Sequence, residues 1–194
     1  MSDDSAVQRA QHKMKLKLKQ RAPLTVSRLE LLEHGSDAKF RHLVHNLFAF
    51  TSLHENVRDG HAAKIGLTGI EYTFLVSLRH LEDDGRVSVT QLSEHLHLSG
   101  AFSTTVIGKL IKKRLAIKEI DAADRRRVSL HVTEKGHDLL ATLAPTQRQV
   151  NDVQFACLSK DDFIWMLDIL EKLIDSSEKA LALQSYFSLH DTDP

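Results

Sequence analysis

Three consecutive arginines, Arg125, Arg126 and Arg127, are the residues of this sequence best suited to binding a polyanion. Guanidinium groups are almost never fully buried without a partner, so this run is expected to face water or phosphate groups. Arg126, the middle residue, is predicted to enter the narrow, electronegative minor groove of DNA. Asp124 can hold a neighbouring guanidinium and stiffen the segment. The chemistry indicated is recognition of a nucleic acid.

The arginines belong to a polar stretch, residues 121–127, that lies between two segments of strand character. Residues 115–120 and 128–132 alternate apolar and polar side chains, or nearly so, which is typical of β-strands. Together these segments predict a β-hairpin with a charged tip.

Two short helices joined by a tight turn are predicted upstream of the hairpin. Thr90 precedes the first and Ser99 opens the second, and both are residue types that cap free N–H groups at a helix start. His97 and Leu98 leave room only for a tight turn between the helices. This spacing favours a helix-turn-helix whose second helix reads DNA.

The second helix must supply both core and contact residues. Its apolar residues, Phe102, Val106, Ile107 and Leu110, are assigned to the core. The DNA-binding candidates are the remaining small, hydroxylated or basic residues together with four from the hairpin: Ser99, Gly100, Ala101, Ser103, Thr104, Thr105, Lys109, Lys113, Asp124, Arg125, Arg126 and Arg127. Serine and threonine can contact bases or phosphates, but they discriminate less between bases than a bidentate arginine does.

The formal net charge of zero conceals a strong asymmetry along the chain. Residues 109–127 carry eight basic and three acidic side chains, a net charge of +5, whereas residues 150–194 carry three lysines and nine acidic side chains, a net charge of −6. One part attracts phosphate and the other repels it, so the pattern favours an oriented complex with double-stranded DNA.

The residues from Leu92 to Gly136 read LSEHLHLSGAFSTTVIGKLIKKRLAIKEIDAADRRRVSLHVTEKG. The order of elements, with the DRR of the wing followed by Leu130 and Thr133, resembles the winged helix-turn-helix of the MarR family of bacterial transcriptional regulators. The resemblance covers about residues 37–186. The sequence departs from the family at Thr105, where an arginine is common, and at Arg114, where a glycine is usual and often marks a positive φ.

The resemblance implies a homodimeric, ligand-responsive transcriptional regulator, most simply a repressor that binds a pseudo-palindromic operator. The implied fold class is mainly α with a small β wing: a winged helix-turn-helix plus a helical dimerisation region. The chain is accordingly divided into a basic N-terminal arm with a short helix (1–36), a dimerisation region (37–66 and 137–194) and a DNA-binding domain (67–136).

Helix boundaries in the first third of the chain are predicted from capping and turn residues. Asp37 is expected to cap a long helix that ends near residue 58, and residues 60–66 are expected to form a loop. Thr68 and Glu71 have the spacing of a capping box for the next helix. Residues 25–33 are predicted to form the short helix of the N-terminal arm.

Regulators of this family respond to a small molecule, often an aromatic acid or related anion, held between the dimerisation helices and the winged helix. Aromatic rings can enclose an apolar body while arginine or histidine meets a carboxylate. The candidate ligand-binding residues are Phe40, Arg41, His42, His45, Phe48, Tyr72 and Arg79. The expected effector is an aromatic carboxylate or its thioester, although core packing and surface charge account for the same residues almost as well.

Other classes of function find less support in the residues. The sequence has no Gly-rich phosphate loop and no GxSxG motif, so neither an enzyme nor a cofactor is predicted. The twelve histidines lack HExxH or CxxC spacing, which predicts no metal site. Cys157, the single cysteine, has apolar neighbours that predict a buried, unreactive thiol. A metal- or oxidant-responsive regulator of the same fold and a winged-helix protein-interaction module without DNA binding remain the alternatives.

The sequence also bears on location. No apolar run reaches the ~20 residues of a membrane span, and the N-terminus lacks the features of a secretory signal, so a cytoplasmic protein without a membrane partner is expected. Residues 1–21 are polar and basic. A solubilising tail and a second contact to DNA or to a partner subunit are both open interpretations of this arm.

Overall fold

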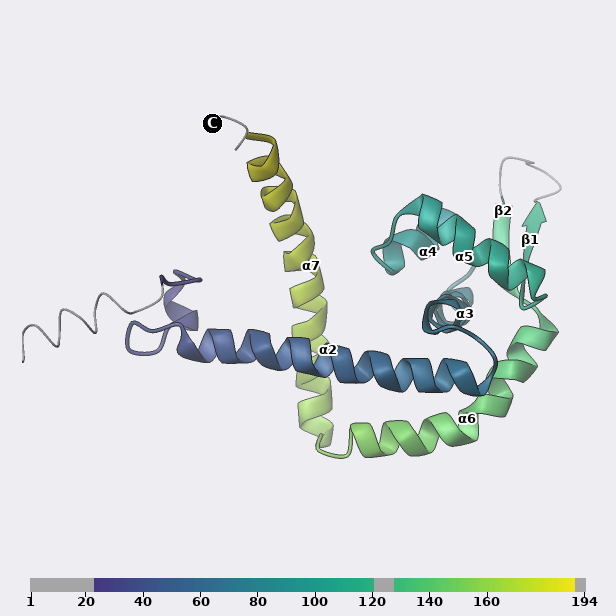
Figure 1. The fold of residues 1–194 in the computed structure, drawn as a ribbon, viewed down its shortest axis with the longest axis horizontal. Coiled ribbons are helices and arrows are strands. Elements are labelled where there is room, and N and C mark those ends of the chain that lie inside the picture. Colours follow the sequence, from purple (N-terminus) through teal and green to yellow (C-terminus); the bar gives the residue numbers. More distant parts are fainter. Residues whose placement is uncertain (1–22, 121–127, 191–194) are drawn as a thin grey trace, which may run out of the picture. The chain divides into compact units, whose positions relative to one another are not determined.

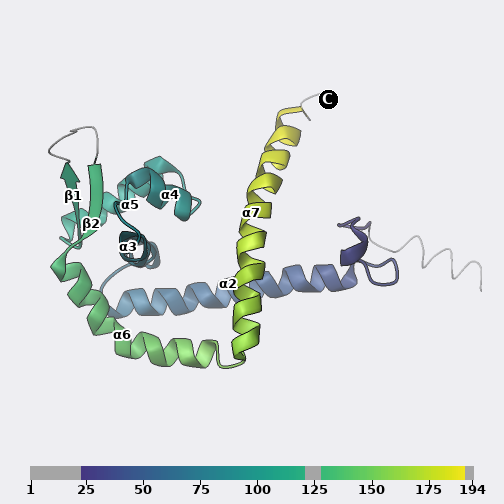
Figure 2. The ribbon, with the colours of Figure 1, turned by 180° about the vertical axis from the view of Figure 1, so that it is seen from behind.

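The computed structural model describes residues 23–120 and 128–190, which form a mainly α-helical chain with one small β-hairpin (Figures 1 and 2). The elements are a single 3-10 turn η1 (Leu29–Leu31), α2 (Ala38–Lys64), α3 (Gly69–Glu82), α4 (Val89–His95), α5 (Gly100–Lys112), β1 (Ala116–Ile120), β2 (Val128–Val132), α6 (Glu134–Gln154) and α7 (Lys160–His190). The predicted class, mainly α with a small β wing, is confirmed. The chain forms two compact units, residues 1–58 and 59–194.

A fully buried carboxylate organises the first unit. Asp37 accepts hydrogen bonds from the backbone N and the Oγ1 of Thr25, both at 2.8 Å, and pairs with the Arg41 guanidinium at 2.6 Å. The hydrogen bond from the Thr25 backbone is the largest of the contacts that hold the pKa of Asp37 below its usual value. Asp37 therefore fastens the N-terminal segment to α2. The helix begins at the next residue, Ala38, and the Asp37 carbonyl accepts a hydrogen bond of 2.9 Å from the Arg41 N–H.

The short helix predicted for residues 25–33 is wrong, because only η1 forms there. The chain reverses at His34 and Gly35, whose φ angles are 50° and 72°. Glu33 and Ser36 exchange two backbone hydrogen bonds of 2.9 Å across this turn. The turn and the attachment of Thr25 to Asp37 together leave no room for a longer helix.

The long helix α2 continues to Lys64, so the predicted end near residue 58 and the loop at residues 60–66 are wrong. Gly60 lies within the helix. Immediately after it, His61 and Ala62 are 6% and 0% exposed, and Ala62 belongs to the apolar core of the second unit. Burial of these residues offsets the cost of a glycine inside a helix, about 0.5–1 kcal/mol.

The apolar core of the second unit is built by α3, α4, α5 and the hairpin (Figure 1). The helix α3 packs against α4, α5 and β2, and α6 packs against β2. Thr68 and Glu71 form the predicted capping box at the start of α3. The residues that are at most 1% exposed include Phe74, Leu75, Leu78, Leu92, Val106, Ile107, Leu110, Leu130 and Leu143. The core role predicted for three residues of α5, Val106, Ile107 and Leu110, is confirmed.

The predicted hairpin is confirmed for its two strands. They pair antiparallel, in a register that runs from Ala116 opposite Val132 to Ile120 opposite Val128. Val87 adds a bridge on the other edge of β2, where the Leu130 N–H donates to the Val87 carbonyl at 2.7 Å. The tip, residues 121–127, lies outside the described residues.

Arg114, between α5 and β1, has a φ of 60°. The left-handed region costs an L-residue about 1–2 kcal/mol, whereas glycine adopts it freely. We therefore expect Arg114→Gly to raise the free energy of unfolding by about 0.5–1 kcal/mol, less than the full strain because glycine also gains entropy in the unfolded chain. Thermal unfolding measures the change. Arg114→Ala is the matched control, since it removes the same guanidinium but keeps the Cβ; an equal rise in both variants would refute the backbone explanation.

Candidate nucleic-acid interface

Side-chain caps fix the starts of both helices of the helix-turn-helix. Ser99 Oγ accepts a hydrogen bond from the Phe102 N–H at 3.3 Å, so the predicted cap of α5 is confirmed. The cap predicted for α4 at Thr90 is wrong. Ser88 Oγ accepts from the Gln91 N–H at 3.1 Å, and Gln91 Oε1 accepts from the Ser88 N–H at 2.8 Å. The Ser-x-x-Gln spacing of this capping box is a sequence signal that would have located the start correctly.

The turn between the helices follows the sequence prediction. His97 has a φ of 50°, and the Leu98 N–H donates to the Ser93 carbonyl at 3.0 Å, which closes the end of α4. The helix α4 then packs against α5. These contacts leave one side of α5 open to solvent.

Small, hydroxylated and basic residues make up the outer face of α5. Its exposed residues of these kinds are Gly100, Ala101, Thr104, Thr105, Lys109 and Lys112. Five of them were DNA-binding candidates from the sequence. Lys112 lies one turn after Gly108 and Lys109 on the same side of the helix. From the sequence it is either a phosphate contact or solvated surface, and its exposure fits both.

The assignment of Ser103 to the outer face and of Phe102 to the core is wrong. Ser103 is fully buried, whereas Phe102 is 44% exposed and touches Phe74 edge to face, with ring centroids 6.4 Å apart. Ser103 precedes Val106 and Ile107 by three and four residues, so it lies in the same buried stripe. Its position on the helix, and not its polarity, decides its burial, and its hydroxyl cannot reach DNA from there.

The two outer threonines use their hydroxyl protons within the helix. Thr104 Oγ1 donates to the Gly100 carbonyl at 2.8 Å, and Thr105 Oγ1 donates to the Ala101 carbonyl at 3.0 Å. A hydroxyl has one proton to donate. Each threonine therefore presents two groups to solvent: a methyl group, and an oxygen that can accept a hydrogen bond.

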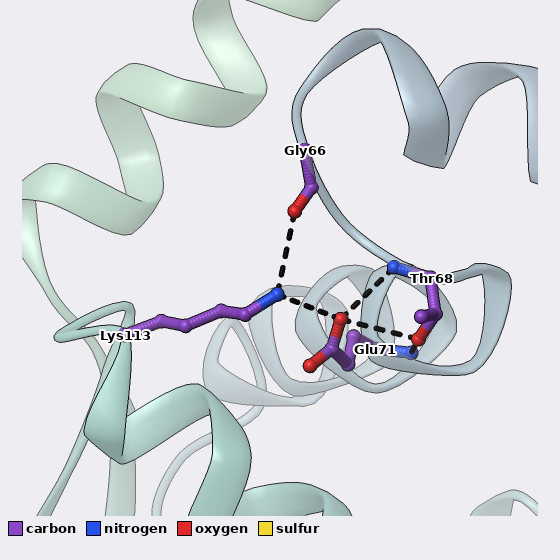
Figure 3. Close-up of polar contacts among 4 residues, drawn as sticks. All are labelled: Gly66, Thr68, Glu71 and Lys113. Atoms are coloured by element: carbon purple, nitrogen blue, oxygen red, sulfur yellow. Dashed lines mark hydrogen bonds and ion pairs between the residues drawn. The ribbon is translucent and has the colours of Figure 1, made fainter.

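Lys113, a predicted phosphate contact, is held by the protein itself. Figure 3 shows its side chain reaching from the end of α5 to Glu71 at the start of α3 and to the Gly66 carbonyl. The ammonium lies 2.9 Å from Glu71 Oε2 and 3.3 Å from the Gly66 oxygen. The same Oε2 accepts from the Thr68 N–H at 2.9 Å and from Thr68 Oγ1 at 3.1 Å. This group of residues, the Glu71–Lys113 network, ties the end of α5 to the start of α3.

The side chain of Glu71 is only 5% exposed, so its ionisation depends on these partners. Burial by itself raises the pKa of Glu71, but the hydrogen bonds from Thr68 and Lys113 together outweigh burial and the pKa lies below its usual value. The carboxylate is therefore charged at neutral pH. Its contribution to stability is lost only as the pH falls through the lowered pKa of the folded protein.

The arginines of the wing, with Asp124, fall within residues 121–127 and thus outside the described part of the chain. The strands that lead to them are described, and exposed apolar residues lie near their distal ends: Ile120 is 64% and Val128 is 38% exposed. The DNA-contacting roles of Asp124, Arg125, Arg126 and Arg127 remain predictions from the sequence.

The ligand-binding candidates of the first unit lie close together in the first third of α2. Arg41 is paired with Asp37, so its charge is already compensated. His42 lies 3.3 Å from the Asn46 amide, and His45 contacts the ring of Phe48, which is 66% exposed. Phe40 is half-buried.

The two candidates on α3 are in contrasting surroundings. Arg79 is half-exposed and pairs with Asp83. Tyr72 is 6% exposed, and its hydroxyl accepts a hydrogen bond of 2.9 Å from Gln147 on α6. Its ring also lies 6.2 Å from that of His61, whose buried Nε2 has no hydrogen-bond partner among the described residues. His61 and Gln147 were missed from the sequence because their proximity to Tyr72 depends on contacts between different helices.

Three further findings concern the predicted absences and the cysteine. Among the described residues, no three histidine, cysteine, aspartate or glutamate side chains gather as a metal ion would require. No helix within residues 23–120 or 128–190 combines the length and apolarity of a membrane span. Cys157 is exposed, so the prediction of a buried thiol is wrong, because its apolar neighbours do not cover it.

Known proteins resemble this chain in both sequence and fold. A sequence model described as the MarR family matches residues 65–127. The transcriptional repressor NicR of Pseudomonas putida is 31% identical over 114 residues, which are 59% of this chain and 70% of that protein. Two solved structures share the fold: Bordetella bronchiseptica BpsR (TM-score 0.56, 24% identity, 68% of this chain and 91% of that one) and S. aureus MepR bound to DNA (TM-score 0.54, 17% identity, 77% and 99%).

The capped helix pair, the exposed face of α5 and the two-stranded wing define a winged helix-turn-helix protein. The chain belongs to the MarR family of transcriptional regulators. Members of this family are DNA-binding transcription factors without enzymatic activity.

Proposed function

We propose that this protein is a homodimeric repressor that binds a pseudo-palindromic DNA operator and releases it when a small aromatic acid or its thioester binds. The observation that carries the DNA-binding part is the exposed outer face of α5, which stands beside a wing whose sequence contains three arginines. Similarity to NicR, named as a repressor, and to MepR, solved with DNA, supports this part. Two-fold symmetry implies half-sites about one helical turn apart.

The dimeric state is supported by the apolar surface of the C-terminal helix. Every residue of α7 is exposed, and its apolar side chains include Phe163 at 54%, Trp165 at 72% and Leu170 at 44%. At the junction of α6 and α7, Phe155 and Met166 line an apolar groove that Leu170 also borders. Soluble monomers rarely expose contiguous apolar surface of this extent. A second copy of the chain is the proposed cover for it.

The proposed roles divide the chain into three regions. In this proposal residues 67–136 read DNA and residues 37–66 and 137–194 form the dimer. The role of residues 1–36 stays open between a solubilising tail and a second contact to DNA or to the partner subunit. The burial of Ala62 among the core residues of the reading domain gives α2 a part in both functions.

The proposal of an aromatic acid as effector rests on polar side chains that lie beside aromatic rings. BpsR is described as a protein whose DNA binding is regulated by 6-hydroxynicotinic acid, an aromatic carboxylic acid. The residues proposed to bind the ligand are Phe40, Arg41, His42, His45, Phe48, Tyr72 and Arg79. We add His61 and Gln147 to this proposal because both contact Tyr72. The unpartnered Nε2 of His61 is a buried polar atom that a ligand carboxylate or hydroxyl could satisfy.

The test of this function begins with the choice of DNA. The purified protein is used to select bound fragments from its own genome, and the selected operator is titrated with and without a panel of aromatic acids and thioesters. A hundredfold loss of operator affinity requires the effector to prefer the released state by ~2.7 kcal/mol. His61→Phe keeps the ring packing but removes the polar nitrogens, and it is expected to reduce the effector response while sparing operator affinity. Indifference of DNA binding to every acid would refute the effector part.

The wing gives a prediction that is independent of the effector. Arg126→Ala is expected to weaken operator binding by about 1–3 kcal/mol, because one minor-groove guanidinium is lost. Fluorescence anisotropy with the selected operator measures the change, and thermal unfolding checks that the fold is kept. Arg148→Ala on α6 is the control, since it removes the same charge far along the sequence from the wing. Wild-type affinity in Arg126→Ala would mean that another wing residue makes the contact.

A further inference from the structure

The N-terminal half of α5, the part of a recognition helix that contacts base edges, lacks the side chains that most often identify bases. Arginine or lysine makes bidentate contacts to guanine, and asparagine or glutamine to adenine. The sequence of α5, GAFSTTVIGKLIK, contains no arginine, asparagine or glutamine, and its lysines, Lys109 and Lys112, lie in its second half. Its outer face offers two threonines, and the lysines come later in the helix. If this helix distinguishes bases directly, the threonines at its N-terminal half must contribute.

The hydrogen bonds within the helix restrict what these threonines can recognise. The protons of Thr104 and Thr105 are committed to the carbonyls of Gly100 and Ala101. Each side chain therefore presents an acceptor oxygen and a methyl group, but no free donor. Ala101, one turn before Thr105, adds a second methyl on the same exposed side.

The major groove presents one base pair that matches this combination. Adenine offers an N6 amino donor and thymine offers a C5-methyl, so an A·T pair provides a donor for the oxygen and a partner for the methyl. Guanine presents only acceptors, N7 and O6, which repel an oxygen that has no proton to give. Cytosine supplies a donor at N4 but no methyl group.

We propose that Thr104 and Thr105 make the reading helix selective for A·T pairs, with Oγ1 accepting a hydrogen bond from adenine N6 and the γ-methyl contacting the C5-methyl of thymine. This inference rests on the proposed function, because it requires α5 to lie in the major groove. It assigns to the two threonines the specificity that the missing arginine, asparagine and glutamine residues do not provide.

The experiment separates the two contacts chemically. Duplexes bound by the wild-type protein are selected from a random library, and single thymines in the half-sites are replaced by deoxyuridine, which removes only the C5-methyl. Single adenines are replaced by purine deoxyriboside, which lacks the N6 amino group. Each sensitive methyl is expected to cost about fourfold in Kd, the factor that corresponds to ~0.8 kcal/mol for one buried methyl-sized group. The same replacements outside the half-sites are the DNA control.

Variants of the protein then assign the contacts to side chains. Thr105→Ser keeps the hydroxyl and removes the methyl, so it should abolish the response to deoxyuridine but keep the response to purine deoxyriboside. Thr105→Val keeps a methyl and removes the oxygen, so the opposite pattern is expected. The same pair of variants is made at Thr104. Thr142→Ser on α6 is the matched control, because Thr142 Oγ1 makes the same kind of bond, 2.9 Å to the Asp138 carbonyl, on another helix.

The possible outcomes distinguish a failure of A·T selectivity from a failure of the proposed DNA-binding function. Selected sites rich in A·T pairs, with the two reciprocal losses at either threonine, support the inference. Tight and selective binding that is unaffected by both base replacements, or that responds equally in the serine and valine variants, overturns the inference and leaves the proposed function standing. A protein that selects no duplex at all overturns both.

Discussion

Leu170→Glu is expected to convert the protein from a dimer into a monomer or an aggregate. Leu170 lies on α7 in line with Phe163, Met166 and Leu173, at a spacing that puts these apolar side chains on one side of the helix. A glutamate placed there would lose its hydration at the proposed subunit interface without gaining a partner, at a cost of several kcal/mol. Sedimentation measures the oligomeric state.

The control for Leu170→Glu is a second variant that places a glutamate on the opposite side of α7. Lys179→Glu places a glutamate among Asp168, Lys172 and Asp175, where the helix is polar. It is expected to leave the protein dimeric. Deletion of residues 159–194 tests the same surface without a point charge and should also abolish the dimer. A well-folded dimer in the absence of α7 would contradict the assignment of this helix to the interface.

Gly136→Ala is expected to give the second large effect, a loss of about 1–3 kcal/mol in the free energy of unfolding. A Cβ at Gly136 would lie 2.5 Å from the carbonyl oxygen of Leu115 and 2.7 Å from Cγ1 of Val132, so the start of α6 or the wing would have to shift. The expected decrease in Tm is about 2–4 °C for each kcal/mol in a protein of this size.

Gly108→Ala distinguishes crowding from the general effect of adding a methyl group. Gly108 is also helical, but a Cβ there would meet no atom within 4 Å. Alanine favours the helix over glycine by about 1 kcal/mol, so this variant is expected to be as stable as the wild type or more stable. Equal stability of Gly136→Ala and the wild type would show that the wing accommodates the extra atom.

Local signals in the sequence predicted much of the fold. The caps at Thr68 and Ser99 join residues three apart, and the strands of the hairpin follow from alternation within each segment, so both can be recognised without knowing the rest of the chain. The continuation of α2 through Gly60 could not be predicted in this way. It depends on the burial of Ala62 by residues of other elements, which overrides a local helix-breaking tendency.

The candidate site was harder to predict for the same reason. Polarity assigned Ser103 to the surface, although helical spacing puts it in the buried stripe with Val106 and Ile107. The bonds of Thr104 and Thr105 to carbonyls four residues earlier involve rotamers that a sequence does not specify. The arginines of the wing are predictable as cations, but their positions on DNA are not.

The attachment of Lys113 to Glu71 also affects how strongly DNA affinity should depend on salt concentration. Each phosphate that a lysine or arginine neutralises releases counterions from the DNA and makes the slope of log affinity against log salt concentration more negative by about 0.9. The ammonium of Lys113 already faces a carboxylate 2.9 Å away, so it is not expected to neutralise a phosphate, whereas the exposed side chain of Lys112 can. Of the eight basic side chains in residues 109–127, Lys113 is therefore not expected to displace counterions from an operator.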